Sequence, residues 1–216
     1  MSNPDSFIDE VTEELRRDRM TGYLRRYGWI AVLAVVLIVG GAAWNEWRKA
    51  SDRASAQAFG DAILAALEND APADRIQAMG QIDTSGPQNG VVSLLGAGEM
   101  FESDRPAALA ALRAASEDDA LTDAYRQLAA LKYVIAAGSD VPAAERETIL
   151  AGLSQPGRPF RPLALEQTAL LQLEQGNTER SIEILTDLLS QSDVSDTLAR
   201  RASQLIIALG GDPAAN

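Results

Sequence analysis

Residues 29–44 read WIAVLAVVLIVGGAAW, a stretch without a charged or strongly polar side chain. A helix needs about 20 mostly apolar residues to cross the hydrocarbon core of a bilayer, and residues 28–47 meet that length. All three tryptophans of the chain lie at the ends of this segment, where amphipathic rings favour the headgroup layer. The sequence therefore predicts a transmembrane helix over residues 28–47.

Two other interpretations of this stretch are weaker. A buried core helix is usually shorter and lacks aromatic residues at both ends. A cleaved signal peptide has a shorter apolar region with a small-residue cleavage site soon after it, whereas Ala54-Ser55-Ala56 lies well past the stretch. We therefore expect an uncleaved anchor.

Basic residues near the two ends of the anchor predict its orientation, because cytoplasmic flanks carry the excess of Lys and Arg. Residues 1–27 are expected in the cytoplasm and residues 48–216 in the periplasm of a bacterium, with the chain as a single-pass inner-membrane protein. The basic residues are Arg16, Arg17, Arg19, Arg25 and Arg26 before the anchor, against Arg48, Lys49 and Arg53 after it.

Residues 1–27 are expected to form an amphipathic cytoplasmic segment. Ile8, Val11 and Leu15 recur with helical spacing and make a narrow apolar stripe. Two roles stay open for this stripe: contact with lipid headgroups, and docking to a cytoplasmic or membrane partner.

The composition argues against several functions. The part after the anchor, residues 48–216, holds 14 basic and 24 acidic residues, which disfavours nucleic acid and a flat position on anionic lipid. The chain has no histidine and no cysteine, so the commonest general base, the thiol nucleophile and most zinc ligands are missing. No phosphate-binding glycine loop or calcium-loop spacing occurs. We expect no enzyme, catalytic residue, metal, cofactor or small-molecule substrate; a carboxylate-based hydrolase stays open without a candidate pair.

From Arg48 onward every segment is rich in good helix formers, and no alternating β-branched pattern appears. Short breaks between helices of about 10 to 20 residues indicate antiparallel pairs, so the predicted fold class is all-α. The first helix is expected to continue from the membrane helix. The breaks carry Gly, Pro, Asn, Asp or Ser and fall at residues 69–72, 83–88, 102–106, 116–119, 138–142, 155–162, 176–177 and 191–193.

The spacing of small residues indicates a tetratricopeptide-like repeat. Small or apolar residues follow 12, 16 and 19 positions after Gly96 and again after Ala169. Such residues let helix axes approach closely, while larger ones fill the layer between pairs. We expect a helical-hairpin solenoid, with a generic helical bundle as the alternative. The predicted contact residues are Ala108, Leu112 and Ala115; then, with three extra residues after Ala129, Ala144, Thr148 and Ala151; then Ser181, Leu185 and Leu188.

The order of these features resembles a known family. The anchor, the helical pairs and the end LEQTALLQLEQGNTERSIEILTDLLSQSDVSDTLARRASQLIIALGG (residues 165–211) look like the tetratricopeptide-like domain of the ancillary SecYEG translocon subunit. A periplasmic cell-division coordinator shares that domain type. The N-terminal SFIDEVTEELRRDR (residues 6–19) before an anchor is similar to the alphaproteobacterial branch. The resemblance implies a periplasmic chaperone-like role at the translocon, with translocon subunits, a membrane-anchored prolyl isomerase or translocating clients as partners.

In repeats of this kind the first helix of each pair lines the concave side. The resulting groove is largely apolar and suits an extended or amphipathic segment of another protein. Tyr133 is its best single anchor, while Leu170 is at least as well explained as core. The predicted groove residues are Ser93, Ala97, Met100, Arg126, Ala130, Tyr133, Glu166, Leu170 and Leu173.

These features lead to two expectations for function. The first is a membrane-anchored scaffold or chaperone that binds protein partners at or near the Sec translocon. The alternative is a periplasmic assembly, cell-division or envelope-biogenesis factor that positions an enzyme through its helical repeats.

The predicted orientation has a direct test. A reporter that works only in the cytoplasm is expected to be silent when fused after Asn216, because the basic flank holds the N-terminus inside. The same reporter fused before residue 1 should be active. Strong activity of the C-terminal fusion would contradict the topology.

Overall fold

A computed structural model describes the backbone of residues 4–213 and the side chains of residues 29–213 other than Ala31. Over these residues the chain forms nine α-helices, one short 3-10 helix and no strand, so the all-α prediction is confirmed. The elements are α1 (Pro4–Leu67), α2 (Pro72–Met79), α3 (Pro87–Met100), α4 (Arg105–Glu117), α5 (Asp123–Ala137), η1 (Gly138–Asp140), α6 (Ala143–Leu153), α7 (Arg161–Glu174), α8 (Thr178–Leu189) and α9 (Asp196–Ala208).

The chain divides into two compact units, Met1–Gly60 and Asp61–Asn216. In the first unit, the side chains from Trp29 to Ala58 are exposed wherever they are described. Among the described residues, no helix is both long enough and apolar enough to cross a membrane. Gly28 and Ala31 of the predicted span, and the side chains of the predicted amphipathic segment 1–27, lie outside the described residues.

The helix boundaries follow the predicted breaks. Each of the eight predicted breaks overlaps a gap between consecutive α-helices, and five of them extend one or two residues into a neighbouring helix. Helix α1 continues past Arg48 to Leu67 as expected. Proline occupies the first turn of α2, α3, α4 and α7, where its missing N–H breaks no helical hydrogen bond. Gly176 follows α7 with φ of +82°, a left-handed conformation in which glycine is the least strained residue.

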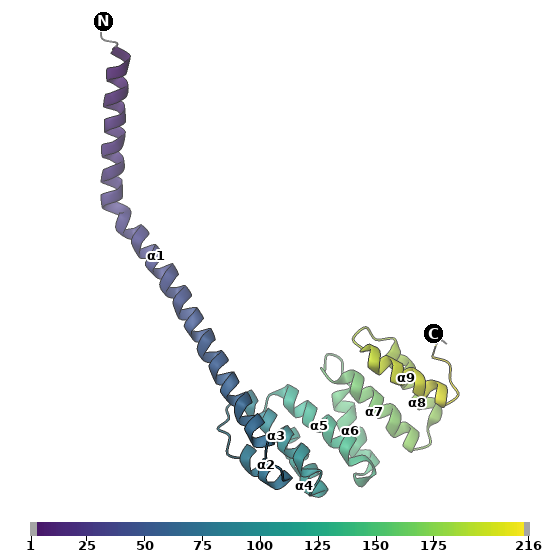
Figure 1. The fold of residues 1–216 in the computed structure, drawn as a ribbon. Coiled ribbons are helices and arrows are strands. Elements are labelled where there is room, and N and C mark those ends of the chain that lie inside the picture. The colour runs from purple at the N-terminus through teal and green to yellow at the C-terminus, as the bar shows by residue number, and fades with distance from the viewer. Residues whose placement is uncertain (1–3, 214–216) are drawn as a thin grey trace. The chain divides into compact units, whose positions relative to one another are not determined.

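The second unit is a stack of helices in chain order (Figure 1). Each helix from α2 to α9 packs on the next one, and α3 also contacts α5. This arrangement is consistent with a helical solenoid, in which each hairpin buries its apolar faces against its neighbours.

Two hydrophobic cores run through this stack. The first joins buried residues of α3 to α7, from Leu94 to Leu171, and the second joins α7, α8 and α9, from Ala169 to Ile206. Helix α7 contributes Leu171 to one core and Ala169 to the other. It therefore belongs to both.

The second helices of three hairpins bury a row of three residues with the same spacing. Ala108, Leu112 and Ala115 are buried in α4, and Ser181, Leu185 and Leu188 are buried in α8, so these two predictions are confirmed. In α6 the prediction is wrong by two residues. Ala144, Thr148 and Ala151 are exposed, and the buried row is Arg146, Leu150 and Leu153.

The longer turn before α6 explains that shift. The 3-10 helix η1 follows α5 directly and delays the start of α6, so five extra residues, and not three, separate Ala129 from the buried row. In α3 the predicted small residue is also displaced by one position. Gly96 is only half-buried, whereas Ala97 is 1% exposed.

Arg146 begins the buried row of α6, at the position that Ala108 holds in the row of α4 and Ser181 holds in the row of α8. Its Nε donates to the Val141 carbonyl at 3.2 Å, and its Nη2 lies 2.7 Å from Glu174 Oε2. A buried charge is tolerated only with such partners. The pair joins the hairpin of α5 and α6 to helix α7.

Arg146→Ala is expected to lower the free energy of unfolding by about 2 kcal/mol, because it removes charge-assisted hydrogen bonds and leaves space in a close contact. Glu174→Gln is the matched variant. The Glu174 side chain is half-exposed, so we expect a cost below about 1 kcal/mol. Urea unfolding followed by circular dichroism measures both; an Arg146→Ala chain as stable as the parent would contradict the role of Arg146.

The pH dependence of stability gives a control for the role of the Arg146–Glu174 ion pair. The hydrogen bond from Arg146 lowers the pKa of Glu174 below its ordinary value. Because the folded-state pKa is the lower one, the pair stabilises the fold above the unfolded-state pKa of about 4.3. That contribution is lost as the pH falls through the folded-state pKa. The stability difference between the parent and Glu174→Gln should therefore shrink below about pH 4.

Candidate functional site

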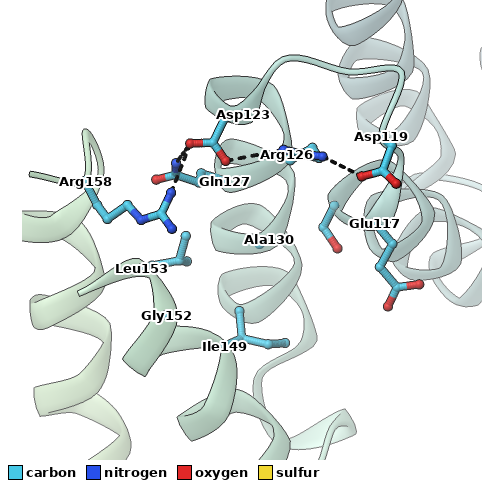
Figure 2. Close-up of a pocket in the computed structure, with 11 residues that line it drawn as sticks. Glu117, Asp119, Asp123, Arg126, Gln127, Ala130, Ile149, Gly152, Leu153 and Arg158 are labelled. Atoms are coloured by element: carbon cyan, nitrogen blue, oxygen red, sulfur yellow. Dashed lines mark hydrogen bonds and ion pairs between the residues drawn. The ribbon is translucent and has the colours of Figure 1, made fainter. Parts of the chain in front are cut away.

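A pocket of about 330 Å³ opens in the middle of the second unit. It lies between the end of α4, the first half of α5, the end of α6 and the loop before α7 (Figure 2). Two residues of the predicted groove, Arg126 and Ala130, line it. The full lining is Ser116, Glu117, Asp119, Asp123, Arg126, Gln127, Ala130, Ile149, Gly152, Leu153 and Arg158.

The apolar part of the pocket lies between α5 and α6. Ala130 of α5 and Gly152 of α6 leave space beside Ile149 and Leu153 (Figure 2). A Cβ atom at Gly152 would meet nothing within 4 Å. Gly152 is the second-last residue of α6.

Gly90 shows the ordinary reason for such a glycine. A Cβ atom there would lie 2.5 Å from Cγ of Tyr125, so the missing side chain lets α3 and α5 pack. Gly152, by contrast, makes no such close approach to another described residue.

The rim of the pocket carries three carboxylates and two guanidinium groups. Arg126 Nη1 lies 2.7 Å from Asp119 Oδ1, and Arg126 Nη2 lies 3.6 Å from Asp123 Oδ1. Arg158 Nη1 lies 3.0 Å from Asp123 Oδ2. Both arginines are thus paired with aspartates. The third carboxylate, Glu117, is paired with Arg113, whose Nε lies 3.4 Å from Glu117 Oε1.

Gln127 is the buried polar residue of the lining, with 6% of its surface exposed. Its Nε2 donates to Asp123 Oδ2. Its Oε1 has no hydrogen-bond partner among the described residues, and a buried acceptor without a donor is unfavourable by about 1–3 kcal/mol.

Tyr133 lies in the core and not on an open groove. It is 5% exposed and packs in the core cluster of α3 to α7. Its hydroxyl donates to Glu145 Oε1 at 3.3 Å, and Glu145 also pairs with Arg113 at 2.7 Å. This placement favours a packing role for Tyr133.

The other predicted groove residues lie outside the pocket. Ser93 is exposed, Met100, Leu170 and Leu173 are half-buried, and Ala97 is buried. Glu166 is also buried, and both its oxygens accept from Arg201, at 2.8 and 2.7 Å. This bidentate pair raises the pKa of Arg201 and joins α7 to α9.

Most of the pocket was not anticipated from the sequence. Glu117, Ile149, Leu153 and Arg158 come from a helix end, a second helix and a loop, whereas the prediction considered first helices only.

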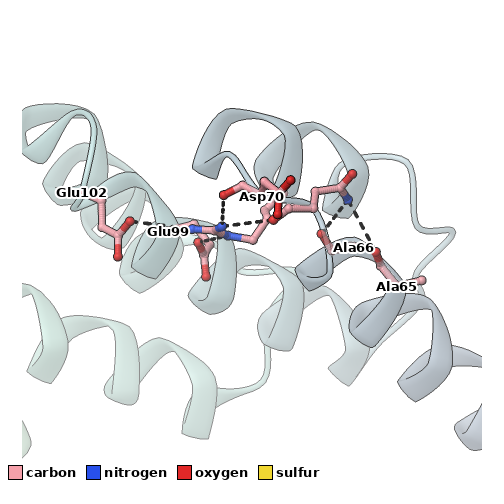
Figure 3. A network of polar contacts seen from close by, with 7 residues as sticks. Ala65, Ala66, Asp70, Glu99 and Glu102 are labelled. Carbon is pink, nitrogen blue, oxygen red and sulfur yellow. Dashed lines mark hydrogen bonds and ion pairs between the residues drawn. The ribbon is translucent and has the colours of Figure 1, made fainter.

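A second polar network belongs to the start of the same unit (Figure 3). Arg75 Nε donates to Glu99 at 2.5 Å, and its Nη1 donates to the carbonyls of Asn69 and Asp70 at 3.1 and 2.9 Å. The Asn69 amide donates to the Ala66 carbonyl at the end of α1. These bonds satisfy a helix end and join α2 to α3, so the network is accounted for by the fold.

The lining of the pocket combines charged and apolar side chains. In the described part of the chain, no group of three or more side chains is placed to hold a metal ion. Comparison with known protein families, with curated proteins and with solved structures found no match to this chain.

Tyr133→Ala is expected to lower the free energy of unfolding by about 3 kcal/mol, because it leaves a cavity in the core. Tyr133→Phe keeps the ring and should cost less than about 1 kcal/mol. Thermal unfolding compares the two. An Ala variant with unchanged stability would contradict the core role and return Tyr133 to partner binding.

Proposed function

We propose that this protein is a single-pass membrane-anchored scaffold that binds other proteins through a tetratricopeptide-like stack of helical hairpins. The observation that carries the proposal is the uncovered apolar segment of α1. Val35 to Val39 are five consecutive large apolar residues, each 59–72% exposed. They cover more than one helical turn, so every side of the helix is apolar there. A helix that is apolar all round needs lipid or a protein core around it.

The ends of this segment support a membrane over a protein core. Trp29 lies at one end, and Trp44 and Trp47 lie at the other, with 63–65% of their surfaces exposed. The rings of Trp44 and Trp47 are 5.2 Å apart, and aromatic pairs of this kind suit the headgroup layer. The excess of basic residues before the segment favours a cytoplasmic N-terminus and a periplasmic second unit in the inner membrane.

The second unit supports protein binding as its role. Stacked hairpins bind through extended surfaces, and its acidic composition does not suit nucleic acid. The resemblance to the ancillary SecYEG subunit makes a chaperone-like position at the Sec translocon the preferred setting. Translocon subunits, a prolyl isomerase or translocating clients are the proposed partners.

The full chain with an affinity tag after Asn216 tests this proposal. It should stay in the membrane fraction at alkaline pH and, in mild detergent, co-purify with translocon subunits. Ile38→Asp should weaken membrane insertion, because a charge at the centre of a span costs about 3 kcal/mol. Ile207→Asp is the matched control, since Ile207 of α9 is 61% exposed but lies far from the segment in sequence.

Three outcomes separate the possibilities. Envelope-biogenesis or division proteins in place of translocon subunits would favour an assembly factor. Release of the parent chain from membranes at alkaline pH would contradict the anchor. Retention of an anchored chain with no co-purified protein would contradict the scaffold.

A further inference from the structure

The helical turns that follow the apolar segment of α1 carry aromatic rings and positive charge together. Residues 44–53 read WNEWRKASDR, and each of their side chains is exposed. The rings of Trp44 and Trp47 lie 5.2 Å apart, and Arg48 and Lys49 follow Trp47 directly. We call residues 44–53 the juxtamembrane segment. It presents indole rings and cations to its surroundings within two turns of helix.

Arg48 and Lys49 differ from most basic side chains of the second unit in having no anionic partner. Neither forms an ion pair among the described residues, although Glu46 and Asp52 lie within about one turn of them. Glu46 pairs instead with Arg53, at 3.7 Å. In the second unit, eight of the ten arginines pair with carboxylates. The two juxtamembrane cations are therefore available to an anion outside the chain.

The position of these cations along α1 corresponds to the level of lipid phosphates. Trp44 and Lys49 are separated by about 7.5 Å along the helix axis, and the headgroup layer on each side of a bilayer is about 5 to 8 Å thick. The Cα–Cβ bonds of a helix tilt toward its N-terminus. Long basic side chains just beyond the apolar segment therefore lean back toward it, which brings their charges to the headgroups.

Repulsion argues against a second copy of this chain as the occupant. Two parallel copies of α1 would bring their own Arg48 and Lys49 to the same level, and facing like charges are unfavourable. Charge also distinguishes the juxtamembrane segment from the rest of the chain. Residues 54–216 hold 11 basic and 23 acidic residues, so an anionic lipid surface repels them while it attracts Arg48 and Lys49.

We propose that the juxtamembrane segment binds the headgroups of anionic phospholipid, with Arg48 and Lys49 on the phosphate. Trp44 and Trp47 contribute rings and N–H donors that suit the same layer. An anionic headgroup offers its phosphate without the ammonium group of a zwitterionic one, so no second cation competes for it. The contact holds α1 at one depth in the bilayer. The inference rests on the proposed membrane anchor, which brings the segment to the headgroups.

The test titrates the lipid-free full chain in mild detergent with dioleoylphosphatidylglycerol, dioleoylphosphatidylcholine or water-soluble glycerol 3-phosphate. Native mass spectrometry counts the bound molecules. The anionic lipid should bind about tenfold more tightly than the zwitterionic one, because each cation near an anionic lipid surface contributes about fivefold and detergent dilutes the effect. Glycerol 3-phosphate should bind at least tenfold more weakly than the anionic lipid, since it has no acyl chains.

A matched pair of double variants locates the contact. Arg48→Gln with Lys49→Gln should reduce the lipid preference to about twofold or less. Arg180→Gln with Arg200→Gln removes the same charge from two exposed arginines of the second unit and should keep the preference. Equal binding of the two lipids by the parent, an unchanged preference in the Arg48 and Lys49 variant, an equal loss in the control, or glycerol 3-phosphate binding as tightly as the anionic lipid would each overturn the inference.

Extraction of the same chains from membranes at alkaline pH separates this inference from the membrane anchor. An Arg48 and Lys49 variant that stays in the membrane and has lost the lipid preference supports both. A parent chain that stays in the membrane and shows no preference refutes the headgroup contact and leaves the anchor. A parent chain that prefers the anionic lipid but is released from membranes refutes the anchor and leaves the contact.

Discussion

The need of each helix to bury its apolar face on a neighbour determines the rest of this structure. Each helix from α2 to α9 packs on the next one along the chain, so burial is obtained by stacking consecutive helices. The buried rows Ala108, Leu112, Ala115 and Ser181, Leu185, Leu188 belong to this stack. Where a small residue is absent from the row, as at Arg146, a paired charge bridges to the next helix instead.

Helix boundaries and two of the three hairpins could be predicted because their signals are local. Proline in a first turn and glycine after α7 act within a few residues. The middle hairpin could not be placed, since η1 lengthens its turn and a charged residue begins its buried row. A search for small residues selects Ala144 there, although only the three-dimensional packing shows that Arg146 is the buried one.

The candidate site was harder to predict from the sequence, because its residues come from several elements that only tertiary packing brings together. Counting along first helices identified Arg126 and Ala130, but the pocket also needs the end of α4, the end of α6 and the loop at Arg158. Burial of Tyr133 depends on the packing of α6, which brings Glu145 to its hydroxyl. Distances between hairpins are set by tertiary packing, and no local pattern encodes them.

The position of α7 between two cores has a further consequence for how this chain opens. Helices α8 and α9 share a core with one side of α7, while the other side belongs to the core of α3 to α6. In quasi-one-dimensional stacks, stability is a sum of local terms, and contiguous parts open separately. The last two helices form such a part. Thermal fluctuation or mechanical tension at the C-terminal end would detach them first and expose the Ala169 side of α7, while the central pocket stays assembled.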